Sequence, residues 1–112
     1  DIGSTAAAYG HAWLAPGWPL ESDAMTAVAY QGLGSLDPVI EFAQQHGKGV
    51  FVLTATSNPE GRGLQQSVSG SGRSVAGHLA RDVAVRTASA PGWGSSGVVI
   101  GATKPIATSA ID

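Results

Sequence analysis

The chain has 112 residues, of which 43% are hydrophobic and 12% are charged, and its formal net charge is −2. This length and hydrophobic content are sufficient for one small domain with a core of its own, which excludes a disordered chain. The sequence contains no cysteine and no basic cluster. It therefore offers no disulfide, thiolate nucleophile or cysteine-bound metal, and nothing in it argues for nucleic acid or an anionic membrane surface as a partner.

The charged fraction is well below the roughly 25% that is usual in soluble domains, and the chain has 16 glycines. Both features indicate that many residues face other protein rather than water. No apolar run approaches the roughly 18 residues needed to span a membrane, and no signal peptide is recognisable. We therefore expect a cytoplasmic protein without a membrane partner.

The first part of the chain predicts a helix followed by a strand. Asp1–Leu14 is rich in alanine, and Ser4 or Thr5 can cap the start of this helix. Prolines and a glycine end the helical pattern. Ser22–Tyr30 is then a short run with strand character, bounded by a polar start and by a Gln-Gly pair.

A second helix follows after a short loop. Ser35 or Asp37 is its predicted cap, and Pro38 lies in its first turn, where proline is well tolerated. Apolar side chains recur at helical spacing until His46 and Gly47, and this glycine is well placed to end the helix.

The stretch Val50–Gly61, VFVLTATSNPEG, is the most informative part of the chain. The predicted strand Gly49–Thr54 opens it with a run of apolar residues, which is typical of a parallel strand covered on both faces. Small polar residues follow, including Ser57 and Asn58, at the position where α/β folds usually bind ligands. A ligand site and a core strand followed by an ordinary polar loop are both consistent with this pattern.

The rest of the chain predicts a long loop, a helix and a third strand. Residues 58–71 contain several glycines and few apolar side chains, and a loop of this length in a compact domain is usually functional or mobile. Gly72–Ala90 returns to a helical pattern, and Gly97–Gly101 reads as another buried strand. A second small polar loop follows that strand over residues 102–105.

The alternation of helices and strands indicates right-handed βαβ units and therefore an α/β fold with a parallel sheet. Three strands with two open edges would make a poor independent fold, and a (β/α)8 barrel needs roughly 250 residues. Both ends of the sequence are abrupt. We expect residues 1–112 to be the central segment of a single (β/α)8 TIM barrel domain, incomplete at both ends.

In such a barrel the functional groups belong at the carboxyl ends of the strands. The polar residues after the second strand qualify, as do Thr103 and Lys104 after the third. Lys104 is either an anion contact or a solvated loop residue. Asp1 would follow a strand that precedes the chain, although an aspartate at this position can also serve as a helix cap.

The histidines His11, His46 and His78 all fall in predicted helices, which lie on the outside of a barrel. We therefore expect them to be surface or packing groups, and their spacing fits no metal site. Because none of them lies near Ser57 in the sequence, Ser57 is better suited to hydrogen bonding with a polar ligand than to nucleophilic attack.

Several segments resemble orotidine 5′-phosphate decarboxylase in its longer bacterial (type 2) form. Asp1–Ala6 is similar to the tail of that family's catalytic segment Asp-x-Lys-x-x-Asp-Ile-x-x-Thr, and Thr54–Gly61 is similar to its substrate loop. Gly72–Ala76 and Gly97–Thr103 resemble later landmarks of the family, and Gly32–Leu36 fits between them. The resemblance covers nearly the whole chain, in register.

The resemblance implies a (β/α)8 barrel that works as a cytoplasmic homodimer with shared active sites. The enzyme would be a carboxy-lyase of pyrimidine (UMP) biosynthesis, converting orotidine 5′-monophosphate to uridine 5′-monophosphate and CO2 without a metal or organic cofactor. An Asp-Lys-Asp array would face the reacting carbon. One carboxylate would lie against the substrate carboxylate, while the lysine would stabilise and protonate the developing carbanion.

By the same resemblance, Asp1 is the last catalytic carboxylate, which the family lends to the active site of the neighbouring subunit. Ile2 would line the pyrimidine pocket, and Thr5 would bond the ribose side. Ser57 would hydrogen-bond the pyrimidine ring, and the pair Asn58 and Pro59 would shape its loop.

The sequence also departs from the family pattern. The catalytic lysine three positions before Asp1, the first aspartate of the motif and the phosphate-gripping segment Pro-Gly-x-Gly-x-Gln-Gly-Gly are not among these 112 residues. Ala29 stands where the family usually has proline. We therefore expect the 112-residue polypeptide alone to be inactive, as a segment of an active enzyme. A non-catalytic barrel remnant or interaction module, and another phosphate-binding barrel enzyme, are the alternative hypotheses.

Overall fold

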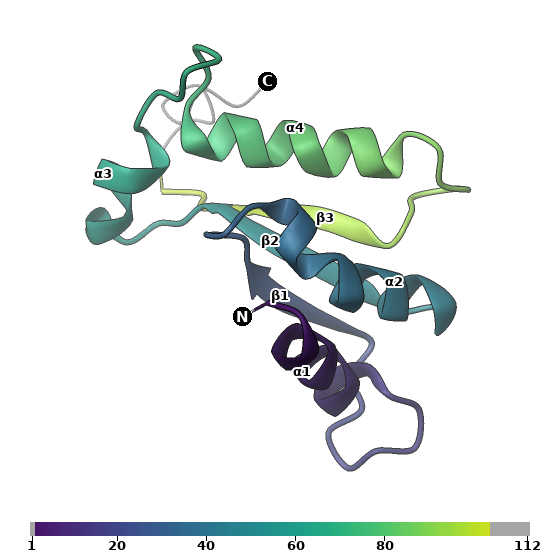
Figure 1. Cartoon of the computed structure of the whole chain (residues 1–112). Helices are drawn as coiled ribbons and strands as arrows, with labels where there is room; N and C mark the ends of the chain where they lie inside the picture. Colours follow the sequence, from purple (N-terminus) through teal and green to yellow (C-terminus); the bar gives the residue numbers. More distant parts are fainter. Residues whose placement is uncertain (1, 104–112) are drawn as a thin grey trace.

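The computed structural model describes residues 2–103, in which helices and strands alternate as predicted (Figure 1). Asp1 and Lys104 lie outside the described residues. The elements are α1 (Ser4–Leu14), β1 (Ala24–Val28), the 3-10 helix η1 (Leu33–Leu36), α2 (Asp37–Gln45), β2 (Gly49–Ala55), the 3-10 helix η2 (Pro59–Gly61), α3 (Arg62–Gln65), α4 (Val75–Thr87) and β3 (Ser96–Ile100).

The strands form one parallel sheet in the order β1–β2–β3. Met25 of β1 pairs with Val50 of β2, which in turn pairs with Ser96 of β3. The predicted parallel α/β sheet is confirmed, with β1 shorter than the run Ser22–Tyr30. Because parallel strands end at the same edge, the loops that follow β1, β2 and β3 lie along one edge of the sheet.

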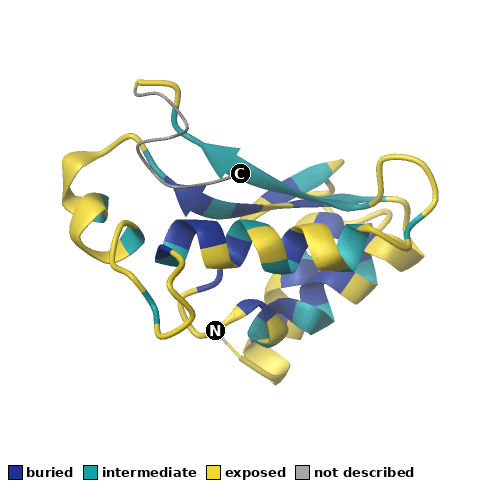
Figure 2. Cartoon of the chain, turned by 90° about the horizontal axis from the view of Figure 1, so that it is seen from above, coloured by how far each residue is buried: buried dark blue, intermediate teal, exposed yellow. Residues whose placement is uncertain are grey.

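Helices α1, α2 and α4 cover one face of this sheet (Figures 1 and 2). Met25 and Ala27 of β1, and Val50 and Val52 of β2, point to these helices and are at most 9% exposed. Burying a side chain such as valine completely is worth about 1.5–3 kcal/mol, so this layer holds the helices on the sheet. The helices contribute Ala6, Leu14, Val39, Ile40, Ala43, Leu79 and Val83 to the same core.

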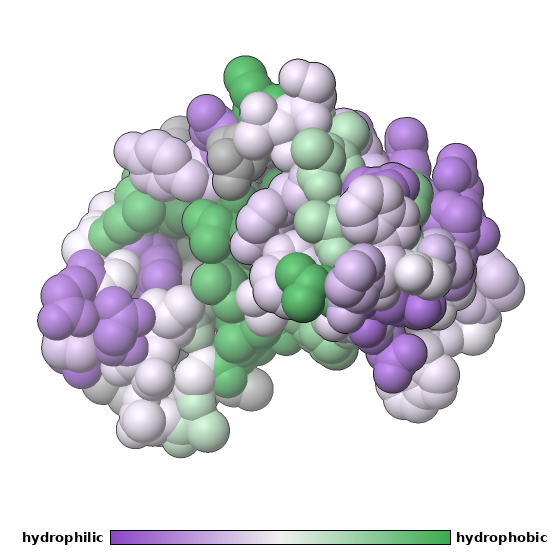
Figure 3. All heavy atoms as spheres, turned by 90° about the horizontal axis from the view of Figure 1, so that it is seen from below, coloured by the Kyte–Doolittle hydropathy of each residue, from purple (hydrophilic) through white to green (hydrophobic). Residues whose placement is uncertain are grey.

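The opposite face of the sheet is open within the residues that the structure describes. Val28 at the end of β1 is 63% exposed, and Phe51 in β2 is 46% exposed. Figure 3 shows hydrophobic residues gathered across the middle of the molecule when it is viewed from below. The expectation that β2 is covered on both faces is therefore wrong for residues 2–103, because buried and more exposed side chains alternate along most of this strand.

The helix starts agree only in part with the predicted caps. Gly3 precedes α1 and no side chain caps it, so neither Ser4 nor Thr5 fills that role. Helix α2 has Pro38 in its first turn, as predicted, but receives no side-chain cap. The first backbone bond of α1 runs from the Ala7 amide to the Gly3 carbonyl at 3.1 Å, so Gly3 is the residue from which this helix starts.

The predicted loop over residues 58–71 contains two short helical turns, η2 and α3. Neither of them has a buried residue. An isolated antiparallel bridge between Val68 and Ser74 then leads into α4. Ser74 caps α4, because its Oγ accepts a hydrogen bond from the Gly77 amide at 2.9 Å.

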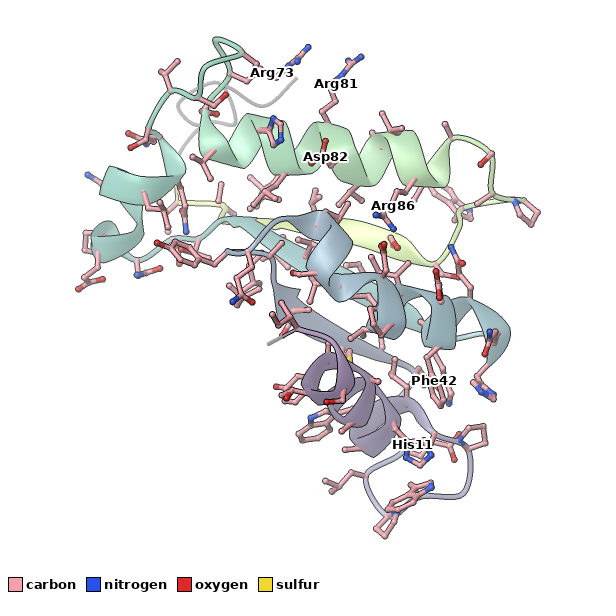
Figure 4. The ribbon with its side chains drawn as sticks, viewed as in Figure 1. His11, Phe42, Arg73, Arg81, Asp82 and Arg86 are labelled. Carbon is pink, nitrogen blue, oxygen red and sulfur yellow. The ribbon has the colours of Figure 1, made fainter. Side chains whose placement is uncertain are left out.

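Charged side chains join neighbouring elements at the surface. Arg86 of α4 forms an ion pair with Asp37 at the start of α2, and Figure 4 shows Arg86 pointing from α4 toward α2. Lys48, directly before β2, forms a 2.7 Å ion pair with Glu21, which precedes β1. The side chain of Lys48 is only 10% exposed, so its aliphatic part packs against the protein while its ammonium group meets the carboxylate.

Two of the histidines are packing groups, as predicted. The ring of His11 lies edge-on against Trp18 at a centroid distance of 4.8 Å and is 5.6 Å from the ring of Phe42. Figure 4 shows His11 of α1 and Phe42 of α2 at this junction. The ring of His46 also packs on Phe42, with a centroid distance of 4.3 Å.

None of the helices in the described part of the chain is long and apolar enough to cross a membrane.

Candidate functional site

The polar residues after the three strands are brought together at one edge of the sheet. The chain leaves β1 at Val28, β2 at Ala55 and β3 at Ile100. Most of the polar groups follow β2. This strand is central in the sheet, so the loops after β1 and β3 lie on either side of its own. This edge is where parallel α/β folds bind ligands.

We call Thr56–Gly61 the Ser57 turn. Its conformation is set by a chain of side-chain hydrogen bonds. Thr56 Oγ1 donates to Asn58 Oδ1 at 2.5 Å, and Asn58 Nδ2 donates to Glu60 Oε2 at 3.1 Å. Gln65 of α3 joins the chain from the other side, since its Nε2 donates to Thr56 Oγ1 at 2.9 Å. Asn58 therefore holds two hydrogen bonds within the turn, one to Thr56 and one to Glu60.

The electrostatics of the Ser57 turn favour a charged Glu60. The backbone amide of Glu60 and the side-chain amide of Asn58 both donate to this carboxyl and hold its pKa below its ordinary value. Pro59 is the first residue of η2 and presets its backbone angle. Residues that directly follow Ser57 therefore contribute to the turn together with Thr56 and Gln65.

Ser57 itself lies against Gly101, the residue that follows β3. A Cβ atom on residue 101 would come within 2.8 Å of the Ser57 backbone nitrogen and 3.0 Å of its Cα. The amide of Gly101 also donates to the carbonyl of Ala55 at 2.6 Å. The two segments that resemble the family's substrate loop and its Gly-Ala-Thr turn therefore touch in the fold.

The hydroxyl groups of Ser57 and Thr54 differ in their surroundings. Ser57 is exposed, and its side chain makes no hydrogen bond within residues 2–103. Thr54, in contrast, is 1% exposed, and its Oγ1 donates to the Val99 carbonyl at 2.9 Å. The Thr54 hydroxyl therefore joins β2 to β3, whereas the Ser57 side chain is exposed.

A cavity of about 410 Å³ lies beside the Ser57 turn, at the carboxyl ends of β1 and β2. Its wall is mainly apolar and includes Tyr30 and Leu79, while Thr56, Gln65 and His78 supply polar groups. Ser57 is not part of this wall. His78 was expected to be a surface or packing group, and it is an exposed residue of α4 at the rim of this cavity.

Ile2 and Thr5 lie at the start of the described chain. Ile2 is 58% exposed and Thr5 is exposed, both near the start of α1, and neither lines the cavity. Asp1 and Lys104, as stated above, lie outside the described residues. Among residues 2–103, no group of three or more His, Asp or Glu side chains could hold a metal ion.

The comparison with protein families decides which family this geometry belongs to. The family model described as "Orotidine 5′-phosphate decarboxylase / HUMPS family" matches residues 1–112. The chain belongs to this family. The resemblance of Asp1–Ala6 and Thr54–Gly61 to that family is thereby confirmed.

Curated relatives of the family are similar over most of this chain. An orotidine 5′-phosphate decarboxylase of Corynebacterium efficiens is 51% identical over 106 residues, which cover 92% of this chain and 38% of the relative. The enzyme of the same name from Streptomyces coelicolor is 48% identical over 103 residues, covering 92% of this chain and 37% of the relative. The chain thus spans a little over a third of the length of these relatives.

Solved structures of the family share the fold. A structure described as a putative orotidine 5′-phosphate decarboxylase from Streptomyces avermitilis superimposes with a TM-score of 0.92 at 46% identity, over 100% of this chain and 39% of that one. The OMP decarboxylase of Leishmania donovani gives a TM-score of 0.77 at 34% identity, over 96% of this chain and 39% of that one. The sheet described above is therefore part of an α/β barrel of this family.

Sequence reasoning did not identify Gln65 as part of the site. This residue lies in a stretch that reads as a loop, and it reaches Thr56 only because α3 folds back over the end of β2. The strand predicted over Ser22–Tyr30 ends at Val28, and Tyr30 lies in the wall of the cavity. A glutamine near the end of a short helix carries no signal that would have predicted its contact.

Proposed function

We propose that the whole protein that carries this chain is an orotidine 5′-phosphate decarboxylase. It would convert orotidine 5′-monophosphate to uridine 5′-monophosphate and CO2, a step of pyrimidine biosynthesis. The observation that carries this proposal is the family match over residues 1–112, together with relatives of that name at 51% and 48% identity. The free hydroxyl of Ser57 at the ligand-binding edge of the sheet supports it.

Within this function the chain supplies the part of the site that holds the base. Ser57 hydrogen-bonds the pyrimidine ring, because its hydroxyl is exposed and unpaired among the described residues while its backbone is held against Gly101. Asn58 and Pro59 keep the turn in shape. A rigid turn places this hydroxyl without an ordering cost when the substrate binds.

Asp1, Ile2 and Thr5 complete the contribution of this chain. Asp1 is the last carboxylate of an Asp-Lys-Asp array and acts in the site of a neighbouring subunit, so the working enzyme is a homodimer. Ile2 lines the pyrimidine pocket and Thr5 bonds the ribose side. The array stabilises the charge that develops as CO2 leaves, and the lysine protonates the carbanion, so catalysis needs no metal or organic cofactor. We place this reaction in the cytoplasm.

A segment exchange tests this proposal. Residues 1–112 replace the matching segment of the Corynebacterium glutamicum relative, which is 52% identical over 106 residues. The chimera should consume orotidine 5′-monophosphate and release CO2, whereas the 112-residue polypeptide alone should show no turnover, because the family's lysine is not among its residues.

Two controls make the result decisive. The unmodified relative sets the reference rate, and the chimera with Asp1→Ala should lose most of its activity. A chimera that folds as a dimer but shows no turnover would contradict the proposal and favour a non-catalytic barrel module. Turnover by the 112-residue polypeptide alone would contradict the assignment of the lysine to the part of the whole protein outside this chain.

A further inference from the structure

Gln65 hydrogen-bonds Thr56 through both the oxygen and the nitrogen of its side-chain amide. Its Oε1 accepts a hydrogen bond from the Thr56 backbone amide at 2.9 Å, and its Nε2 donates to Thr56 Oγ1, also at 2.9 Å. Gln65 is partly buried, whereas the next residue, Gln66, is exposed. The two bonds reach from the last residue of α3 to the residue directly before Ser57.

The Ser57 turn has no apolar anchor of its own. No residue of η2 or α3 is buried, and Leu64, the largest apolar side chain in these two turns, is 49% exposed. Burial therefore contributes little to the position of η2 and α3, and their hydrogen bonds decide where they lie. Gly61 permits these hydrogen bonds, because a Cβ atom there would approach Gln65 Nε2 and Thr56 Oγ1 to 2.8 and 2.9 Å.

The hydrogen bonds of the Ser57 turn can run in only one direction. The carboxylate of Glu60, ionised at neutral pH, only accepts, so the NH2 group of Asn58 must face it and the Asn58 oxygen must face Thr56. The Thr56 hydroxyl then donates to that oxygen and accepts from Gln65 Nε2. The Thr56 backbone amide can only donate, which fixes Gln65 Oε1 toward it. The Glu60 carboxylate and the Thr56 backbone amide, at the two ends of this series of hydrogen bonds, therefore require the same orientation of the Asn58 and Gln65 side-chain amides.

We propose that Gln65 is a positioning residue for Ser57. It fixes Thr56 on one side of Ser57, while Gly101 packs against the Ser57 backbone on the other. These two contacts hold the Ser57 backbone in place at the edge of the sheet where β2 and β3 end. This role rests on the proposed contact between Ser57 and the pyrimidine ring, and it adds to that function a residue that does not itself touch the substrate.

The kinetic test uses the full-length protein that carries this chain. Gln65→Ala removes both of its bonds to Thr56, whereas Thr56→Val removes the hydroxyl with its bonds to Gln65 and Asn58 but keeps the bond from the backbone amide to Gln65. We expect kcat/KM for orotidine 5′-monophosphate to fall about tenfold in Gln65→Ala and less in Thr56→Val. Gln66→Ala, one residue further on and exposed, should leave kcat/KM unchanged.

A double-mutant cycle separates positioning from general destabilisation. If Gln65 acts through Ser57, the variant that combines Gln65→Ala with Ser57→Ala should be no slower than Ser57→Ala alone. Fully additive losses would show that Gln65 acts elsewhere and would overturn the proposal. Equal rates for Gln65→Ala and the unmodified protein would overturn it as well.

Hydrogen exchange gives a readout that does not depend on turnover. In the ligand-free protein the Thr56 amide should exchange at least tenfold faster in Gln65→Ala than in Gln66→Ala, because its acceptor is gone. Equal exchange rates of the Thr56 amide in the two variants would refute the hydrogen bond between Gln65 and this amide. Faster exchange in a protein that never decarboxylates orotidine 5′-monophosphate would refute the proposed function and the role of Gln65 in it, while leaving the hydrogen bonds established.

Discussion

Gly101 lies directly against the backbone of Ser57, so close that a Cβ atom at position 101 would approach the Ser57 nitrogen to 2.8 Å. The contact joins the turn after β2 to the turn after β3. Since the near atoms belong to the backbone, they cannot move aside as a flexible side chain would. The exposed hydroxyl of Ser57 therefore depends on the absence of a side chain at position 101.

The first prediction concerns this contact. Gly101→Ala should lower the free energy of unfolding by about 1–3 kcal/mol, as overpacking usually does, and should also displace Ser57 and lower kcat/KM. Denaturant unfolding and steady-state kinetics of the full-length protein measure the two effects. Gly63→Ala is the matched control, because a Cβ atom there meets nothing within 4 Å. Because residue 63 lies in a helix, Gly63→Ala should instead raise the free energy of unfolding by about 0.5–1 kcal/mol.

The second prediction concerns the start of α4. Ser74→Ala removes the acceptor of the Gly77 amide and should cost about 1 kcal/mol of stability. Ser4→Ala is the control, because Ser4 begins α1 but caps nothing; its effect should stay within about 0.5 kcal/mol. The difference in urea midpoint between the two variants checks this. Equal losses would mean that Ser74 does not act as a cap.

The third prediction concerns pH and Glu21. Hydrogen bonds from the Lys48 ammonium and the Gly17 amide lower the pKa of Glu21. A carboxyl whose pKa is lower in the folded state adds stability above its ordinary pKa and loses that contribution as the pH falls through the folded-state value. Glu21→Gln should therefore be less stable than the unmodified protein at neutral pH, and the difference should vanish in acid. Urea unfolding across this pH range measures it, with a difference independent of pH as the contrary result.

The fourth prediction concerns the open face of the sheet. The 112-residue polypeptide exposes Phe51 and Val28 on this face and should associate with itself or have poor solubility. Phe51→Thr should shift the sedimentation profile toward monomer. Val52→Thr, on the buried face of the same strand, is the matched contrast and should unfold the chain rather than disperse it. A monomer with a sharp two-state transition in the unmodified polypeptide would contradict this prediction.

Much of the fold could be predicted from local pattern. The apolar run at Gly49–Thr54 and the run at Gly97–Gly101 correspond to β2 and β3 within a residue, because a short apolar stretch between turn residues satisfies its backbone and side chains best in a sheet. The helix over Gly72–Ala90 was predicted too long, since Ser74 caps it and it ends at Thr87. The exposure of Phe51 was missed, because an apolar strand gives no sign of which face is covered.

The sequence by itself determined the order of the elements and the family, since hydrophobic periodicity and the motif around Ser57 are local properties of the chain. Only the tertiary structure decided what holds Ser57. Gly101 is far from Ser57 in the sequence and meets it because the parallel sheet brings the ends of β2 and β3 together. Gln65 lies in a stretch that reads as a loop, and it meets the Ser57 turn because α3 folds back onto the end of β2. Hydrogen-bond partners and close backbone approaches depend on this packing, and no spacing along the chain encodes them.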